Sequence, residues 1–227
     1  RDLAQATALK VYPEAVNITH ARDQQSLVVQ ALMPNGTTVD VTEQVSWKIG
    51  NEKAARLENQ RLLPVADGVT ELTVSLGDLK AQVPVSVTNS ATRHPISFEL
   101  DVMPVFMKAG CNSGGCHGAA RGKDGFRLSL YGFDPKGDYH RLTREMAGRR
   151  IDLSLPENCL LIEKAAGEVS HTGGQLIKKD DVYYRTLVEW LNDGAPTDAA
   201  AVPKVEKIEV YPPSAILEGS GAAQKLT

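Results

Sequence analysis

Two of the chain's three cysteines lie just before a histidine, in Cys111-Asn112-Ser113-Gly114-Gly115-Cys116-His117. Two thiols followed directly by an imidazole are the arrangement that attaches c-type haem, because the thiols form thioethers with the porphyrin vinyl groups and the imidazole binds the iron. The usual motif has two residues between the cysteines, whereas this loop has four. The motif predicts Cys111 and Cys116 as the thioether positions and His117 as the proximal iron ligand of one haem c per chain. We expect the longer loop to rely on the backbone freedom of three glycines, Gly114, Gly115 and Gly118.

Two other interpretations use the same side chains. A structural zinc site could combine Cys111, Cys116 and His117 with Cys159 or another histidine. Adjacent ligands from one turn are unusual for zinc, because both side chains must bend toward one ion. A disulfide between Cys111 and Cys116 is the other alternative, and it would leave His117 without a role.

Iron held by one histidine has a second face, and the occupant of that face separates an electron carrier from a gas-binding or catalytic haem. The strongest candidate is His171, which is followed by Thr172, Gly173 and Gly174 in a loop where glycines let the backbone pass close to a flat macrocycle. Two imidazole ligands predict a low reduction potential. An absent or displaceable His171 would instead indicate a haem enzyme or a gas sensor. The other candidates are more typical of a core or a surface: Met103, Met107, Met146, His140 and Cys159.

Buried haem propionates need cationic or amide partners. We expect Arg149, Arg150 and Lys123 to provide them, with Arg121 behind. The alternative is that these residues are solvated surface charges.

The segment 98–197 predicts a mainly α-helical domain that positions these side chains. A helix capped by Asp101, with Pro104 in its first turn, leads to Cys111. A later helix begins at Asp180 or Asp181 and ends near Gly194. Three elements are expected between them: a strand-like segment over 126–131, a polar helix near 137–147 and a helix over 156–166.

The first part of the chain has the pattern of short β-strands separated by turns, among them an Asn35-Gly36 hairpin signal. It predicts an all-β sandwich of the Greek-key kind over 1–89, followed by a polar linker over 90–97. The expected strands are 9–12, 26–32, 37–41, 45–49, 71–76 and 81–87.

The end of the chain repeats its beginning. Ile208-Glu209-Val210-Tyr211-Pro212 aligns with Leu9-Lys10-Val11-Tyr12-Pro13, and the same register brings 224–226 onto 25–27. We therefore expect 198–227 to contain a linker and the start of a second, truncated copy, within a longer protein of repeated modules.

Two resemblances follow from these motifs. Both copies resemble the bacterial immunoglobulin-like group 2 domain, through Val-Tyr-Pro and, in the first copy, Asp40-Val41-Thr42 and Val45-Ser46-Trp47. Residues 98–197 resemble the planctomycete-type cytochrome c domain, in Gly115-Cys116-His117-Gly118 and His171-Thr172-Gly173-Gly174 among other stretches. That resemblance implies the same thioether and iron-ligand positions and a large exported multidomain protein. Cys159 departs from the family pattern, in which serine is expected.

The composition argues against two classes of binding partner. The 227 residues carry a net charge of -3, which gives no basic surface for nucleic acid, and no apolar run is long enough to span a membrane. Covalent haem attachment takes place outside the bacterial cytoplasm, so we expect a periplasmic or cell-surface location.

The sequence as a whole predicts an immunoglobulin-like sandwich followed by a mainly α cytochrome c-like domain. We expect this domain to exchange electrons with an unidentified redox partner, as one segment of a larger polypeptide, rather than to be a catalyst in its own right. The alternatives are the open-site haem enzyme or sensor and a structural or adhesive module with a zinc site.

Overall fold

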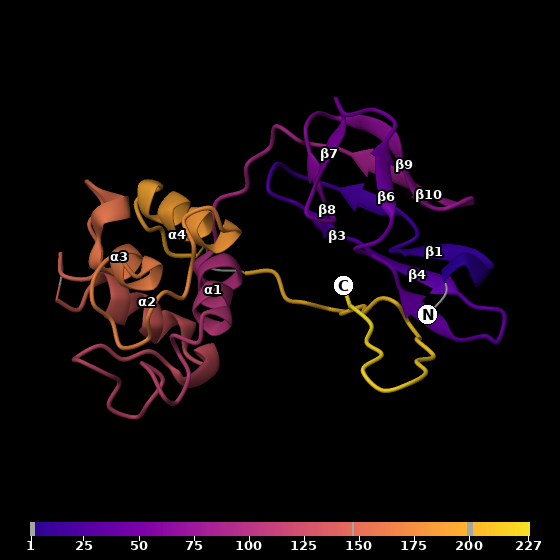
Figure 1. Ribbon diagram of the computed structural model, residues 1–227. Helices are drawn as coiled ribbons and strands as arrows, with labels where there is room; N and C mark the ends of the chain where they lie inside the picture. Colours follow the sequence, from indigo (N-terminus) through magenta and orange to yellow (C-terminus); the bar gives the residue numbers. More distant parts are fainter. Residues whose placement is uncertain (1–2, 147, 199–201) are drawn as a thin grey trace. The chain divides into compact units, whose positions relative to one another are not determined.

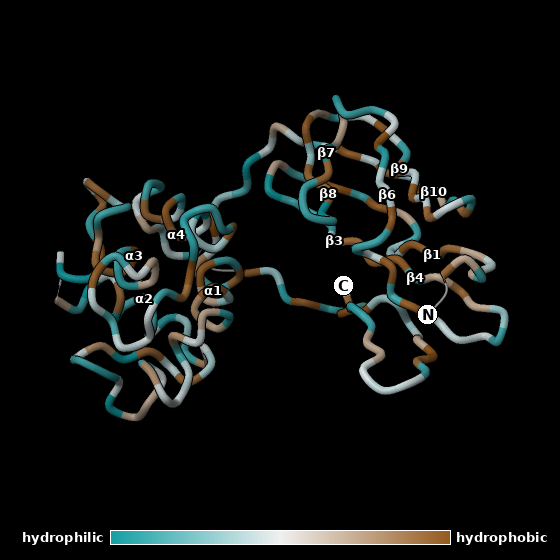
Figure 2. Tube along the Cα trace, viewed as in Figure 1, coloured by the Kyte–Doolittle hydropathy of each residue, from teal (hydrophilic) through white to brown (hydrophobic). Residues whose placement is uncertain are grey.

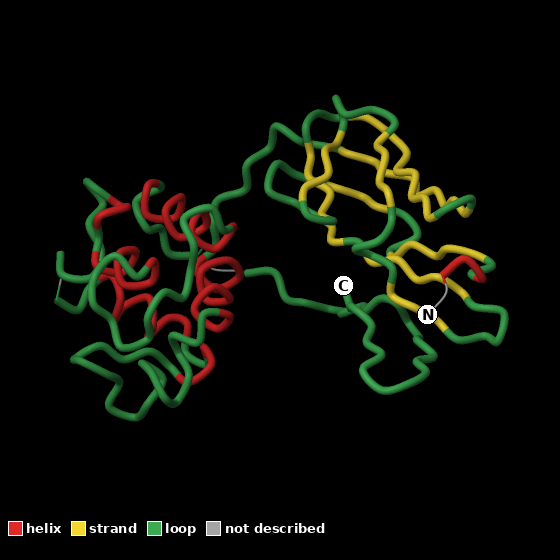
Figure 3. Tube along the Cα trace, viewed as in Figure 1, coloured by secondary structure: helices red, strands yellow, loops and turns green. Residues whose placement is uncertain are grey.

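The computed structural model describes residues 3–146, 148–198 and 202–227, and the chain divides into two compact units. The first unit comprises Arg1–His94 together with Val205–Thr227, and the second comprises Pro95–Lys204. Within the described residues, the first unit contains three β-sheets and the second contains four α-helices (Figure 1; Figure 3). None of the described helices has the length and apolar character that crossing a membrane requires.

The described strands of the first unit form one four-stranded and two three-stranded sheets. In one three-stranded sheet, β4 (Val28–Leu32) pairs antiparallel with β1 (Ala8–Tyr12) and β5 (Thr38–Asp40). The four-stranded sheet has the order β2 (Val16–Ile18), β10 (Leu79–Val87), β9 (Gly68–Leu76) and β6 (Ser46–Ile49), with β2 parallel to β10. The other three-stranded sheet has the order β3 (Gln25–Ser26), β8 (Arg61–Pro64) and β7 (Ala55–Glu58).

The strands form where apolar residues alternate with polar ones. Along β1, Leu9 and Val11 are buried while Lys10 is exposed, and along β10 the residues Val83 and Val85 are buried on either side of an exposed proline. In β1 and β10 the alternating apolar residues belong to one shared hydrophobic core. Figure 2 shows the hydropathy of the residues along the trace. Each predicted strand segment contains a strand, and Gly36 has the positive φ that the turn between β4 and β5 requires.

Three strands were not predicted, namely β2, β7 and β8. The turn between β7 and β8 consists of Asn59 and Gln60, both with positive φ. Glycine usually occupies the second of these positions, so the sequence lacks the usual hairpin signal.

The C-terminal segment 205–227 belongs to the first unit and contains no helix or strand among its residues, all of which are described (Figure 3). It lies along the edge strand β5, where the Thr38 N–H donates to the Ile216 carbonyl at 2.8 Å. The Lys225 N–H donates to the Asp40 carboxylate at 2.6 Å, and the rings of Tyr12 and Tyr211 stack. The repeated sequence therefore packs against the first copy.

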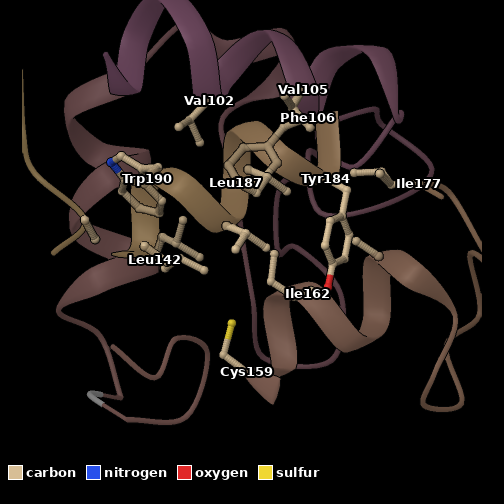
Figure 4. Packing of buried hydrophobic residues seen from close by; sticks show 14 of the residues in the cluster. Val102, Val105, Phe106, Leu142, Cys159, Ile162, Ile177, Tyr184, Leu187 and Trp190 are labelled. Atoms are coloured by element: carbon tan, nitrogen blue, oxygen red, sulfur yellow. The ribbon is translucent and has the colours of Figure 1, made fainter. Parts of the chain in front are cut away.

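The second unit is built from short helices around one core. A π-helical turn (Phe98–Val102) continues into α1 (Met103–Lys108), followed by a 3₁₀ turn (Leu130–Gly132), α2 (Pro135–Thr143), a second 3₁₀ turn (Pro156–Asn158), α3 (Leu160–Ala166) and α4 (Val182–Asn192). Figure 4 shows side chains of α1, α3 and α4 meeting in this core, with Phe106, Leu187 and Ile162 among them.

The two long predicted helices are present, with one correction at the first. Asp181 caps α4 by accepting from the Tyr183 N–H, as expected. Ser97, rather than Asp101, caps the first helical segment by accepting from the Leu100 N–H, and the Asp101 carboxylate accepts from the Ser97 N–H. The helical segment begins earlier than predicted because its first amides are satisfied by side chains. Ser97 and Asp101 accept from two of them, and the Asp198 carboxylate accepts from the Phe98 and Glu99 N–H groups at 3.0 and 2.8 Å.

Two predictions between these helices are also corrected. The segment 126–131 forms no strand. It has one bridge at Phe126 and runs into the 3₁₀ turn at Leu130, while the Leu128 and Tyr131 amides donate to the carbonyls of His117 and Asn112 in the preceding loop. The predicted helix over 156–166 is interrupted at Cys159, whose ψ of 150° is extended, and Gly167 ends α3 in a left-handed conformation. The polar helix corresponds to α2, and Ala147 at its predicted end lies outside the described residues.

Candidate functional site

A pocket of about 890 Å³, including its open mouth, lies within the second unit. The pocket brings together seven of the side chains that the sequence selected for the haem site, but not Arg121: Cys111, Cys116, His117, Lys123, Arg149, Arg150 and His171. Its remaining wall is mainly apolar and includes Phe106, Phe126, Leu128, Leu142, Leu160, Leu161, Leu176, Ile177 and Leu187.

The two cysteines are held in residues 110–118, which we call the Cys-His loop. Gly110 has a φ of +74° directly after α1, and the Cys111 N–H donates to the Phe106 carbonyl at 2.9 Å. The His117 N–H returns to the Cys111 carbonyl at 2.9 Å, which closes the loop on itself. Four residues between the cysteines are therefore accommodated as a closed turn at the end of α1.

The expected role of the loop glycines needs correction. The left-handed conformation is adopted by Gly110, whereas Gly114, Gly115 and Gly118 have φ outside that region. A Cβ at Gly118 would lie 2.1 Å from the carbonyl oxygen of Asn112. Gly118 is therefore required for close backbone approach and not for its φ.

Cys111 and Cys116 are free, half-buried thiols, so the disulfide alternative is not formed. Burial, with a smaller contribution from the neighbouring Cys116, raises the pKa of Cys111 to about 11. The Cys111 side chain is therefore a neutral thiol at neutral pH, at the wall of an apolar pocket.

His117 is oriented by the chain segment that follows it. Its Nδ1 lies 3.0 Å from the Phe126 carbonyl oxygen, and its ring packs against the Phe126 ring at a centroid distance of 4.8 Å. Burial lowers the pKa of His117, which favours the neutral imidazole that binds metals. With Nδ1 hydrogen-bonded, Nε2 is the nitrogen left for a ligand in the pocket.

His171 also has its Nδ1 near a backbone carbonyl. Its Nδ1 lies 3.4 Å from the Gly174 carbonyl oxygen, within a turn in which the Gly174 N–H donates to the His171 carbonyl. A Cβ at Gly173 would lie 2.8 Å from His171 Cε1, so the ring position depends on that glycine.

The rings of His117 and His171 lie in nearly parallel planes, 7° apart, with centroids separated by 6.5 Å. Two imidazoles that bind one metal ion from opposite sides, each nitrogen about 2.0 Å from the ion, have centroids roughly 6.4 Å apart. The observed centroid separation is close to that value.

The predicted cationic residues differ in their surroundings. Arg150 is buried, and its guanidinium donates to the carbonyls of Arg141, Glu145 and Gly125. Lys123 and Arg149 line the pocket. Lys164 on α3 lines the pocket as well. It was not predicted, because the periodicity of the α3 sequence does not show which face of the helix borders the pocket.

The other candidate iron ligands are not among the lining residues of this pocket within the described chain. Met103 is buried in the core, Met107 and Met146 are exposed, and His140 lies on α2. Burial raises the pKa of Cys159, whose sulfur belongs to the hydrophobic core (Figure 4).

The residues fit a haem with two imidazole ligands better than they fit zinc. No three side chains of the His, Cys, Asp or Glu type gather at metal-binding distance within the described chain. A tetrahedral zinc site needs three or four such ligands, whereas a haem iron needs two, because the porphyrin supplies the rest.

Comparisons with known proteins add little to this geometry. No protein-family model matches the chain, and no curated protein matches it. Among solved structures, domains 1–6 of the surface layer protein SbsC align with a TM-score of 0.29 and 18% identity, covering 40% of this chain and 14% of that one. Domains 5–6 of the S-layer protein SbsC align with a TM-score of 0.28 and 18% identity, covering 37% and 52%. This similarity is too distant to assign a function.

Proposed function

We propose that the second unit binds one c-type haem covalently and transfers electrons. The observation that carries the proposal is the pair of parallel imidazoles 6.5 Å apart, each with its Nδ1 facing a backbone carbonyl. His117 is the proximal ligand and His171 the distal one, and Cys111 and Cys116 are the thioether positions. The family resemblance of residues 98–197 to planctomycete-type cytochrome c domains supports the same assignment.

The haem supplies a one-electron couple, and the chain sets its surroundings. The apolar wall of Phe106, Leu128 and Leu187 excludes water, while Lys123, Arg149 and Lys164 offer charges to the propionates. Two imidazoles in place of a histidine and a methionine favour ferric iron, so the potential is low. Electron transfer by such a haem requires no catalytic acid or base.

The first unit is proposed to be an immunoglobulin-like spacer in a larger exported protein. Its alternating strands and the repeated Tyr-Pro segments at Tyr12 and Tyr211 support this assignment. Export follows from the haem proposal, because the haem is attached outside the cytoplasm.

The mass and the spectrum of the protein test the proposal. The chain is produced in a host equipped for covalent haem attachment, and we expect a denatured mass larger by one haem and a six-coordinate low-spin spectrum. A double Cys111→Ala, Cys116→Ala variant should lose the added mass, and Cys159→Ser, as the matched control, should keep it. A colourless protein with the mass of its amino acids alone would refute the proposal.

The distal ligand has a separate test. We expect His171→Ala to convert the low-spin spectrum to a high-spin or mixed one, because the sixth position loses its imidazole. His140→Ala is the control, since His140 lies outside the pocket lining. An unchanged spectrum in His171→Ala would remove His171 from the iron.

A second candidate function is a haem sensor or enzyme with a displaceable distal ligand. It is favoured by the weak contact that positions the His171 ring: the distance from His171 Nδ1 to the Gly174 carbonyl oxygen is 3.4 Å, and the rest of the loop is exposed. Rapid and complete carbon monoxide binding by the reduced protein would support this candidate, and slow or partial binding would support the electron carrier.

A further inference from the structure

Arg150 is a buried cation placed one contact away from His117. It is 7% exposed, and its guanidinium donates to the Arg141 carbonyl at 2.7 Å and the Glu145 carbonyl at 2.6 Å. A third bond goes to the Gly125 carbonyl at 2.9 Å. The Glu145 carboxylate lies 4.0 Å from the guanidinium, so the three shorter bonds to carbonyls are the contacts that satisfy its buried donors and fix its position.

The same guanidinium lies over the ring of Phe126, with Cζ 4.6 Å from the ring centroid. Arg150 therefore holds two adjacent residues, the backbone of Gly125 and the side chain of Phe126. A cation over an aromatic face is attractive, and more so when both groups are shielded from water.

Phe126 in turn contacts His117 through both its backbone and its ring. Its carbonyl lies 3.0 Å from His117 Nδ1, and the two rings pack at 4.8 Å. Phe126 closes a tight turn with Lys123, in which Asp124 and Gly125 both have positive φ. Because the turn is short, fixing the Gly125 carbonyl also fixes the direction of the Phe126 carbonyl.

We propose that Arg150 is a positioning residue that holds the Phe126 carbonyl against His117 Nδ1. This contact keeps the Nδ1–H tautomer and points Nε2 into the pocket. The effect on iron rests on the proposed function, but the effect on the tautomer does not. The role differs from the propionate contact expected from sequence, since the guanidinium is directed at backbone carbonyls.

The tautomer of His117 is the direct test. ¹⁵N-labelled histidine NMR of the whole chain, reduced if it carries haem, should show a proton on His117 Nδ1 that exchanges slowly with water. Arg150→Met keeps an apolar chain over Phe126 but removes the bonds and the charge, so we expect faster exchange of that proton. Arg150→Lys should restore part of the protection, and Arg144→Met, at an exposed arginine, should leave it unchanged.

A second variant keeps the test decisive if Arg150→Met fails to fold. Phe126→Leu removes the ring under the guanidinium and keeps the carbonyl, and we expect a smaller loss of protection in the same direction. Protection equal to the wild type in a folded Arg150→Met, or in Phe126→Leu when only that variant folds, would overturn the inference.

The haem-loaded protein gives an independent readout. Loss of a cation near the iron favours the ferric state, so Arg150→Met should have a lower reduction potential than the wild type, with Arg150→Lys between them. If no haem is bound, the proposed function fails while the tautomer measurement still decides the role of Arg150. If haem is bound and neither tautomer nor potential changes, the role of Arg150 fails and the proposed function stands.

Discussion

At the scale of single residues, the Cys-His loop can close only because the Asn112 carbonyl oxygen and the Gly118 Cα approach each other closely. The Asn112 carbonyl accepts from the Tyr131 N–H and also lies where a Cβ of residue 118 would be. The loop therefore depends on the absence of a side chain at Gly118 as much as on the cysteines themselves.

Gly118→Ala should accordingly damage the site. The added Cβ would lie 2.1 Å from a backbone oxygen, so the loop must move. We expect a loss of about 1–3 kcal/mol in the stability of the second unit, as for other overpacked sites, and a much reduced yield of haem-bearing protein by mass. Gly115→Ala is the matched control, because its Cβ would meet nothing within 4 Å. Equal haem yields in the two variants would contradict this account of the loop.

At the scale of elements, α3 and α4 form one wall of the pocket, and the connection between them carries His171. This connection is anchored at its end by the Leu176 and Ile177 amides, which both donate to the Ala165 carbonyl, and by the ion pair of Lys179 with Glu168. Its middle is exposed, so local contacts within the turn must set the direction of His171.

Gly173→Ala tests the contacts of this turn. Its Cβ would lie 2.8 Å from His171 Cε1, so we expect the imidazole to be displaced and the low-spin fraction of the spectrum to fall. Gly174→Ala is the comparison, because φ at Gly174 is +67° but its Cβ would meet nothing within 4 Å. It should cost about 1 kcal/mol through backbone strain with a smaller spectral change. A full low-spin spectrum in Gly173→Ala would mean that the turn does not position His171.

At the scale of the whole molecule, the two units have separate hydrophobic cores. Buried residues of the first core lie between Leu9 and Val87, and those of the second lie between Ile96 and Ala195. Residues that share one hydrophobic core unfold cooperatively. Because the two units have separate cores, each unit should unfold in a transition of its own.

Calorimetry of haem-bearing and haem-free protein should separate these transitions. The thioether bonds persist in the unfolded chain, but iron ligation and packing of the haem form only in the folded second unit, so haem should raise one transition temperature and leave the other in place. The Cys111→Ala, Cys116→Ala variant provides the haem-free form, and Cys159→Ser is the control for cysteine loss. A shift of both transitions, or a single transition, would contradict independent cores.

The sequence alone determined the local features of this protein. The Cys-x4-Cys-His spacing, the Asp181 cap and the alternation in β1 and β10 are set by neighbours along the chain, and the structure has the corresponding loop, helix and strands. The Asn59-Gln60 turn and the early start at Ser97 were missed, because their conformations depend on contacts that residue types signal only weakly.

Only the tertiary structure decided which distant groups meet. The sequence could place His171 in a glycine-containing loop, but the 6.5 Å distance to His117 depends on α3 and α4 packing against α1. It selected Arg150 as a charge, whereas the fold buried that charge against the carbonyls of Gly125, Arg141 and Glu145. The physical reason is that turns and caps are local, while burial and partner choice are fixed by packing between segments far apart in the chain.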